Sequence, residues 1–158
     1  MANFLERLVA EWYQYKQYFV IQNANVGARD LGGYESELDV VAFSPSRKEI
    51  LHFETSTDAS TWSRREERYA KKFEAGRRYI PKLLSLDSAD GYTFEQVALF
   101  VFASATNVKT VGGGRIVPIN DFIREIKLDL ATKKVASAAV PEQFALVRAI
   151  QFAVQYGD

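Results

Sequence analysis

Two acidic side chains inside apolar segments are the residues of this chain best suited to chemistry. Asp39 lies in segment 37–43 (ELDVVAF), and Glu54 lies in segment 50–56 (ILHFETS). Both segments are rich in β-branched and aromatic residues, and a turn-forming connector joins them, which predicts a β-hairpin. Because side chains alternate along a strand, the two carboxylates can converge from neighbouring strands. Carboxylates in apolar strands cost free energy unless they bind something, and a hard cation such as Mg²⁺ is a suitable partner.

The same hairpin resembles the core of the PD-(D/E)xK nuclease superfamily, in its Holliday-junction-resolvase-like branch. That family has Glu-x-Asp at the end of one strand and Glu-x-Lys on the next. Glu37-Leu38-Asp39 matches the first part, and Glu54-Thr55-Ser56 matches the second, except that Ser56 stands in the place of the lysine. The resemblance covers roughly the first half of the chain. It implies one nuclease-like domain over residues 1–158, with a restriction-endonuclease-like three-layer α/β/α fold.

The resemblance also implies a set of metal ligands. Asp39 and Glu54 would bind Mg²⁺ or Mn²⁺, together with the main-chain carbonyl of Thr55. A glutamate on the first helix often completes the site in this family, and here Glu11 is the candidate, because helical spacing places it on an inward line of residues 4, 8, 11 and 15. The alternative for Glu11 is an ordinary ion pair with a lysine or arginine at the flank of the helix.

The missing lysine leaves two outcomes open. Ser56 can hydrogen-bond water but carries no positive charge, so transition-state stabilisation would be weaker unless a lysine from elsewhere reaches the site. Lys72, or its neighbour Lys71, on the following helix is the first candidate, which gives a catalytic set of Glu11, Asp39, Glu54, Ser56 and Lys72. Otherwise the protein binds metal or nucleic acid and cleaves poorly or not at all.

The helix expected over residues 61–79 carries the one clear charge asymmetry of the chain, whose formal net charge is zero. One interpretation is a face that contacts nucleic-acid phosphates beside the acidic site. The other is a solvated helix face with Glu–Arg and Glu–Lys pairs. The residues assigned to nucleic-acid contact are Arg64, Arg65, Arg68, Lys71 and Lys72.

Other catalytic classes are excluded by composition. His52 is the sole histidine and there are no cysteines, which excludes multi-histidine metal sites, cysteine-ligated zinc and thiol chemistry. A half-buried structural histidine is the simplest interpretation of His52. No stretch is apolar enough to span a bilayer, so we expect no membrane contact and a cytoplasmic location.

The remaining elements predict an α/β fold. We expect helices over 3–19, 61–79 (ended by Pro81), 120–130 and 141–156, with strands over 19–26, the hairpin, 96–103 and 115–119. Pro118 suggests that the last strand is an edge or ends there. This order predicts a central mixed sheet of about four to five strands, with helices on both faces and a right-handed crossover from the Glu54 strand.

The function that these features predict is a divalent-metal-dependent nuclease, which hydrolyses phosphodiester bonds in DNA rather than RNA. The first alternative is a catalytically inactive module on a nuclease-like scaffold, which binds nucleic acid or assembles with proteins. The second is a protein-interaction subunit that needs neither metal nor nucleic acid. A homodimer or a partner protein is compatible with all three.

Overall fold

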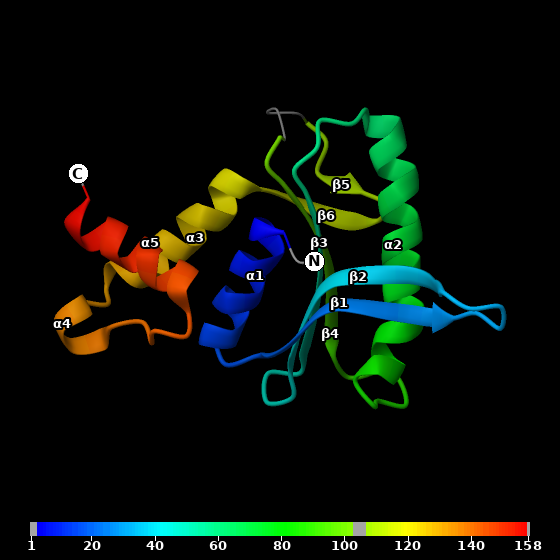
Figure 1. The fold of residues 1–158 in the computed structure, drawn as a ribbon, viewed down its shortest axis with the longest axis horizontal. Helices are drawn as coiled ribbons and strands as arrows, with labels where there is room; N and C mark the ends of the chain where they lie inside the picture. Colours follow the sequence, from blue (N-terminus) through cyan, green and yellow to red (C-terminus); the bar gives the residue numbers. More distant parts are fainter. Residues whose placement is uncertain (1–2, 103–106, 158) are drawn as a thin grey trace.

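A computed structural model describes residues 3–102 and 107–157 as one mixed sheet with helices on both faces (Figure 1). The general α/β class predicted from the sequence is confirmed. The helices are α1 (Phe4–Tyr15), α2 (Trp62–Leu83), α3 (Ile119–Ala131), α4 (Val135–Ala138) and α5 (Ala145–Tyr156). The strands are β1 (Phe19–Ala28), β2 (Tyr34–Ser44), β3 (Glu49–Ser56), β4 (Thr93–Phe100), β5 (Thr110–Val111) and β6 (Gly114–Pro118).

The sheet has six strands in the order β1-β2-β3-β4-β6-β5, more than the four to five predicted. β1, β2 and β3 form an antiparallel meander, and β2 and β3 are the predicted hairpin. β3 and β4 are parallel and are joined through α2, as the expected crossover requires. β6 is parallel to β4. The two-residue strand β5 pairs with β6 and forms the edge of the sheet. β5 was not predicted because two residues carry no periodic signal.

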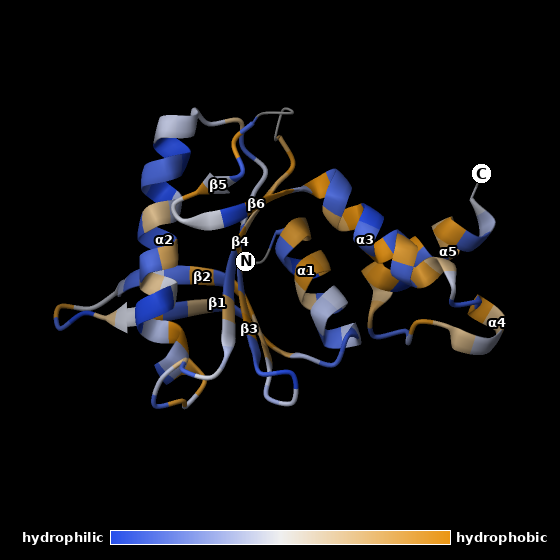
Figure 2. Ribbon diagram, turned by 180° about the vertical axis from the view of Figure 1, so that it is seen from behind, coloured by the Kyte–Doolittle hydropathy of each residue, from blue (hydrophilic) through white to orange (hydrophobic). Residues whose placement is uncertain are grey.

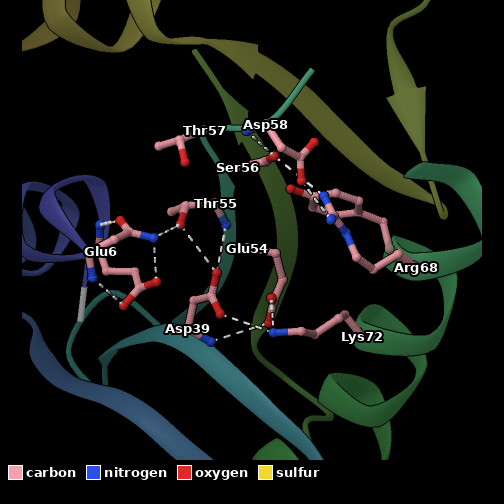
Figure 3. Close-up of a pocket in the computed structure, with 11 residues that line it drawn as sticks. Glu6, Asp39, Glu54, Thr55, Ser56, Thr57, Asp58, Arg68 and Lys72 are labelled. Atoms are coloured by element: carbon pink, nitrogen blue, oxygen red, sulfur yellow. Dashed lines mark hydrogen bonds and ion pairs between the residues drawn. The ribbon is translucent and has the colours of Figure 1, made fainter. Parts of the chain in front are cut away.

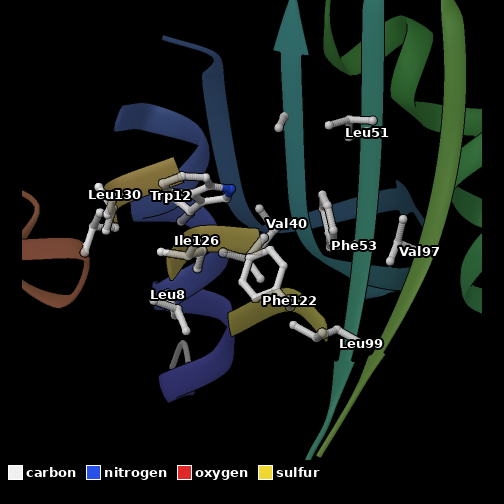
Figure 4. Close-up of a cluster of buried hydrophobic side chains, with 14 of the residues drawn as sticks. Leu8, Trp12, Val40, Leu51, Phe53, Val97, Leu99, Phe122, Ile126 and Leu130 are labelled. Carbon is white, nitrogen blue, oxygen red and sulfur yellow. The ribbon is translucent and has the colours of Figure 1, made fainter. Parts of the chain in front are cut away.

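One face of the sheet packs against α1, α3 and α5 through a single apolar cluster (Figure 4). Val40, Phe53 and Leu99 of the sheet contact this cluster from one side, and Trp12 of α1 and Ile126 of α3 enter it from the helices. All five side chains are almost completely buried. Side chains alternate along β2 and β3, so Val40 and Phe53 lie on the opposite face of the sheet from Asp39 and Glu54, as the strand period predicts.

The other face packs against α2, whose solvent side is mainly hydrophilic (Figure 2). Tyr69, Phe73 and Ile80 form the buried stripe of this helix. Gly76 lies on the same stripe directly against the sheet, where a Cβ atom would be 2.3 Å from Nδ1 of His52. The glycine therefore allows α2 to approach β3 more closely than any other residue would.

Several predicted boundaries are wrong. α2 does not end at Pro81 but continues to Leu83, because a proline in the last turn removes only one hydrogen bond of the helix. α1 ends at Tyr15 rather than residue 19, and α5 begins at Ala145 rather than at the predicted 141. Of the two alternatives predicted for Pro118, the strand end is confirmed, because Pro118 ends β6 and β6 is not an edge strand. Ala103, the last residue of the predicted fourth strand, lies outside the described residues. None of the helices in the described ranges is long and apolar enough to cross a membrane.

We expect Gly76→Ala to lower the free energy of unfolding by about 1–3 kcal/mol, measured by urea denaturation. The ring of His52 is buried and hydrogen-bonded at both nitrogens, so it cannot move away from an added methyl group. This steric cost must exceed the helix preference for alanine over glycine, which is about 1 kcal/mol.

The matched control is Ser63→Ala on the exposed side of the same helix, which should change stability by less than about 0.5 kcal/mol. An unchanged or increased stability of Gly76→Ala would show that α2 does not lie this close to β3.

Candidate active site

The site forms where β2 and β3 separate. Their main-chain pairing ends at Val40 and Phe53, so the next residues, Asp39 and Glu54, face each other outside the ladder. The side chains replace the missing main-chain partners: the amide of Asp39 donates to Oε1 of Glu54 (3.3 Å), and the amide of Thr55 donates to Oδ2 of Asp39 (2.8 Å). Both carboxyl groups are therefore fixed by the backbone of the neighbouring strand.

Lys72 of α2 places its ammonium group between these two carboxylates (Figure 3). Its Nζ is 3.0 Å from Oδ1 of Asp39 and 2.7 Å from Oε2 of Glu54, and it also donates to the main-chain carbonyl of Glu37 at 2.7 Å. Burial disfavours the charged form of Lys72, but Glu54 and Asp39 outweigh this and raise its pKa above the ordinary value. Lys72, predicted as the replacement for the motif lysine, is thus brought to the acids, and the side chain of Glu37 stays exposed.

Glu54 is the most deeply buried acid of the site, and burial raises its pKa above the ordinary value. Its Oε1 also lies 2.8 Å from Nε2 of His52, a fully buried ring. The side-chain amide of Gln96 lies 3.0 Å from Nδ1 of the same ring and 2.8 Å from the carbonyl of Phe73. Because the amide nitrogen of Gln96 is a donor, Nδ1 accepts and Nε2 carries the proton that His52 donates to Glu54. His52 is therefore fully buried, not half-buried, and it orients Glu54.

Asp39, Glu54 and Lys72 line a cavity of about 260 Å³. The side chains that form it come from the start of α1, the facing ends of β2 and β3, the loop after β3, and α2. They are Asn3, Glu6, Asp39, Glu54, Thr55, Ser56, Thr57, Asp58, Arg68, Tyr69 and Lys72. Four carboxyl groups and two basic side chains meet here, so the cavity has an excess of negative charge and favours a cation.

Ser56, the residue in the place of the motif lysine, lies beside a different cation. Arg68 Nη2 is 3.4 Å from its Oγ, while Arg68 Nη1 donates to Oδ2 of Asp58 at 2.7 Å. The amide of Asp58 also donates to Oγ of Ser56 at 3.2 Å. The hydrogen bond to Arg68 is the main reason that the pKa of Asp58 is held far below its usual range. Two basic side chains of α2, Lys72 and Arg68, thus bring positive charge to separate parts of the cavity.

Sequence reasoning missed Glu6, which lines the cavity from the first turn of α1. Its carboxylate accepts from the main-chain amide of Asn3 (3.1 Å) and from the side-chain amide of Asn23 (3.0 Å). Asn3 in turn caps the helix by accepting from the amide of Glu6 at 3.0 Å. The signal was present as the spacing Asn-x-x-Glu, a capping box, which fixes a glutamate at a helix N-terminus.

The prediction that Glu11 joins the metal site is wrong. Its Oε2 accepts from the amides of Leu146 (2.7 Å) and Val147 (3.4 Å), so Glu11 caps the N-terminus of α5 on the opposite face of the sheet. The expected inward line began at Phe4, but Phe4 is 63% exposed and the buried side of α1 is centred on Leu8 and Trp12 instead. Glu11 therefore borders the neighbouring helix rather than the acidic cavity.

The predicted nucleic-acid face of α2 divides into three parts. Arg68 and Lys72 reach the cavity, whereas Arg64 and Lys71 point to solvent, and Lys71 pairs with the exposed Glu67. The assignment of Arg65 to nucleic-acid contact is wrong.

Arg65 is buried, with its guanidinium over the rings of Trp62 (5.0 Å) and Phe100 (4.5 Å). Its Nη2 donates to the carbonyls of Asp58 and Phe102, which ties the loop after β3 to the segment that follows β4. Arg65 therefore holds in place the loop that carries Asp58, one of the residues that line the cavity.

The oxygen atoms of the cavity fit a hard divalent cation. One ammonium contacts both Asp39 and Glu54, so a single cation can reach both carboxylates. The main-chain carbonyl of Thr55 faces the same side, because the amide of this strand residue points toward Asp39. Within residues 3–102 and 107–157, no three acidic or histidine side chains are close enough together to hold a metal ion by themselves. An ion here would therefore keep several waters, as Mg²⁺ commonly does.

We expect Glu11→Gln to lower the free energy of unfolding by about 1 kcal/mol and to leave every property of the acidic cavity unchanged. The substitution removes a negative charge from a helix N-terminus but touches none of the residues around Asp39. Chemical denaturation and a Mn²⁺ titration of the same variant check both halves. A loss of Mn²⁺ binding would contradict this assignment of Glu11.

The raised pKa of Glu54 predicts a pH dependence of stability. A carboxyl group with a raised pKa contributes its full stability below the ordinary value of 4.5 and loses it as the pH rises through the folded-state pKa. We therefore expect Glu54→Gln to become more stable relative to the wild type as the pH is raised from about 4 to about 8. Denaturation curves across this range measure the difference, and Glu67→Gln, an exposed acid, should show no such trend. If the difference in unfolding free energy between Glu54→Gln and the wild type stays constant with pH, the pKa of Glu54 is not raised.

No protein-family model matches this chain, and a search of the curated proteins finds no match either. The likeness to PD-(D/E)xK nucleases therefore rests on the hairpin residues and on the order of the elements.

Proposed function

We propose that this protein is a divalent-metal-dependent phosphodiester hydrolase of the PD-(D/E)xK type, acting on DNA rather than RNA. The observation that carries the proposal is the convergence of Asp39 and Glu54 on one ammonium group at the point where their strands separate. The order α1-β1-β2-β3-α2-β4, with β3 and β4 parallel, supports a restriction-endonuclease-like core.

Each residue has a role in this proposal. Asp39, Glu54 and the carbonyl of Thr55 would hold Mg²⁺ or Mn²⁺, which when bound polarises the phosphate and lowers the pKa of a water molecule. His52 fixes the orientation of Glu54 and leaves its second oxygen, Oε2, facing the cavity. Lys72 supplies the positive charge that the motif lysine has in the family, and it would stabilise negative charge that develops on the phosphate.

We expect Asp39→Asn to reduce Mn²⁺-dependent cleavage by at least about 100-fold, because one ligand of the cation loses its charge. Lys72→Met should reduce cleavage strongly as well, whereas Lys71→Met, the adjacent lysine, should cleave like the wild type. The assay offers single-stranded, duplex and branched DNA and single-stranded RNA to each purified protein. Thermal unfolding of each variant is recorded to confirm that it is folded.

The outcome that contradicts the proposal is equal cleavage by Asp39→Asn and the wild type, which would assign the activity to a contaminant or to another site. Equal losses in Lys71→Met and Lys72→Met would contradict the assigned role of Lys72, because they would indicate a general effect of charge.

A second candidate function is a nucleic-acid-binding module that does not cleave. The observation in its favour is that Lys72 already compensates both carboxylates, so the protein can be stable without a divalent ion. This candidate predicts salt-dependent DNA binding in EDTA and no cleavage in Mn²⁺. Metal-dependent cleavage that is lost in Asp39→Asn would exclude it.

A further inference from the structure

We propose that Tyr69, Arg68 and Ser56 form a binding site for a phosphodiester oxyanion beside the carboxylate pair. The inference rests on the proposed hydrolase function and deepens it, since it names the residues that hold the phosphate of the substrate. It also assigns a function to Tyr69, which helical spacing alone identifies only as a core residue.

The hydroxyl group of Tyr69 is the first observation. The side chain is 2% exposed and lines the cavity, yet its Oη forms no hydrogen bond of normal geometry within the described residues, although the side chains of Ser56 and Arg68 lie near it. An unpartnered buried hydroxyl costs free energy, so folding alone gives no reason to keep it. Burial raises the pKa of Tyr69 and keeps the hydroxyl protonated, so it is available as a hydrogen-bond donor.

The second observation is that the neighbouring groups are donors too. Oγ of Ser56 accepts from the amide of Asp58 and lies within 3.4 Å of Arg68 Nη2, so its own proton is free to be donated. Arg68 is held in place by Asp58 through Nη1, which leaves Nη2 directed at Ser56 and the cavity. Arg68 donates to Ser56 and brings a positive charge, while the hydroxyl protons of Ser56 and Tyr69 have no acceptor assigned among the described residues. Together these groups fit an anionic oxygen, the atom that a phosphodiester presents.

The negative charge of the cavity decides how this anion binds. Glu6, Asp39, Glu54 and Asp58 outnumber Arg68 and Lys72 there, so a phosphate alone would be repelled. A divalent cation on Asp39 and Glu54 would remove this excess. We therefore expect phosphate binding at Tyr69 to require a divalent cation.

The test uses dithymidine phosphodiester and its neutral methylphosphonate analogue as probes, titrated in Ca²⁺ and followed by NMR chemical shifts. The wild type should bind the phosphodiester about tenfold more tightly than the analogue, since a hydrogen bond to a charged oxygen has about this effect. Tyr69→Phe and Arg68→Gln should each lose most of this preference, and EDTA should abolish it.

Matched controls separate this role from folding. Tyr79→Phe removes a hydroxyl from the same helix, where it bonds to Glu35, and Arg124→Gln removes an exposed charge on α3. Both should bind both probes like the wild type. Tyr69→Phe should unfold at the same or a higher denaturant concentration, because it loses no hydrogen bond in the folded protein.

The outcomes for the binding site and for the hydrolase are distinguishable. Selective phosphodiester binding that is lost in Tyr69→Phe, without cleavage of any substrate in Mn²⁺, supports the binding site and overturns the hydrolase. Cleavage that needs Asp39, together with equal binding of both probes by the wild type and Tyr69→Phe, overturns the binding site and leaves the hydrolase intact.

Discussion

The structure depends on one electrostatic constraint, the compensation of two sheet carboxylates by an ammonium group on a helix. Isolated charges at this depth would cost several kcal/mol each, so Asp39, Glu54 and Lys72 must stay together. Arg68, Lys72 and Gly76 are spaced by four residues and share one side of α2. The missing side chain of Gly76 brings that side against β3, and this close approach lets both cations reach the cavity. The close packing of α2 on the sheet is thus what allows its cations to compensate the carboxylates.

The sequence predicts the parts of this arrangement that follow from local periodicity. Strand alternation is enough to place Asp39 and Glu54 on the same side of the sheet. The following basic segment indicates that a lysine can reach them, but the sequence leaves Lys72 and Lys71 as alternatives. Glu11 shows where this reasoning stops. Its partner is the N-terminus of α5, more than a hundred residues away, and no local pattern indicates which helix end will need a carboxylate.

Arg65 shows a different limit, because spacing and charge disagree there. It follows Trp62 by three residues and precedes Tyr69 by four, which places it on the buried side of α2. Its charge instead suggested a contact with phosphates. The position along the helix decided the outcome, since two aromatic rings and two main-chain carbonyls compensate the buried guanidinium. The short elements β5 and α4 could not be predicted for a simpler reason, because neither is long enough to repeat its period, which is 2 residues for a strand and about 3.6 for a helix.

The distribution of energetic costs argues for a function at this cavity independently of any resemblance. Three buried polar atoms lack partners in the described part of the chain, and one of them, Oη of Tyr69, belongs to a residue that lines the cavity. The same cavity holds Glu54, whose ionisation is disfavoured by burial, and an excess of carboxyl groups. Elsewhere acids such as Glu11 and Asp129 cap a helix or pair with lysines. Folding alone would favour the removal of these costs at the cavity, which supports the proposed binding of a charged ligand there.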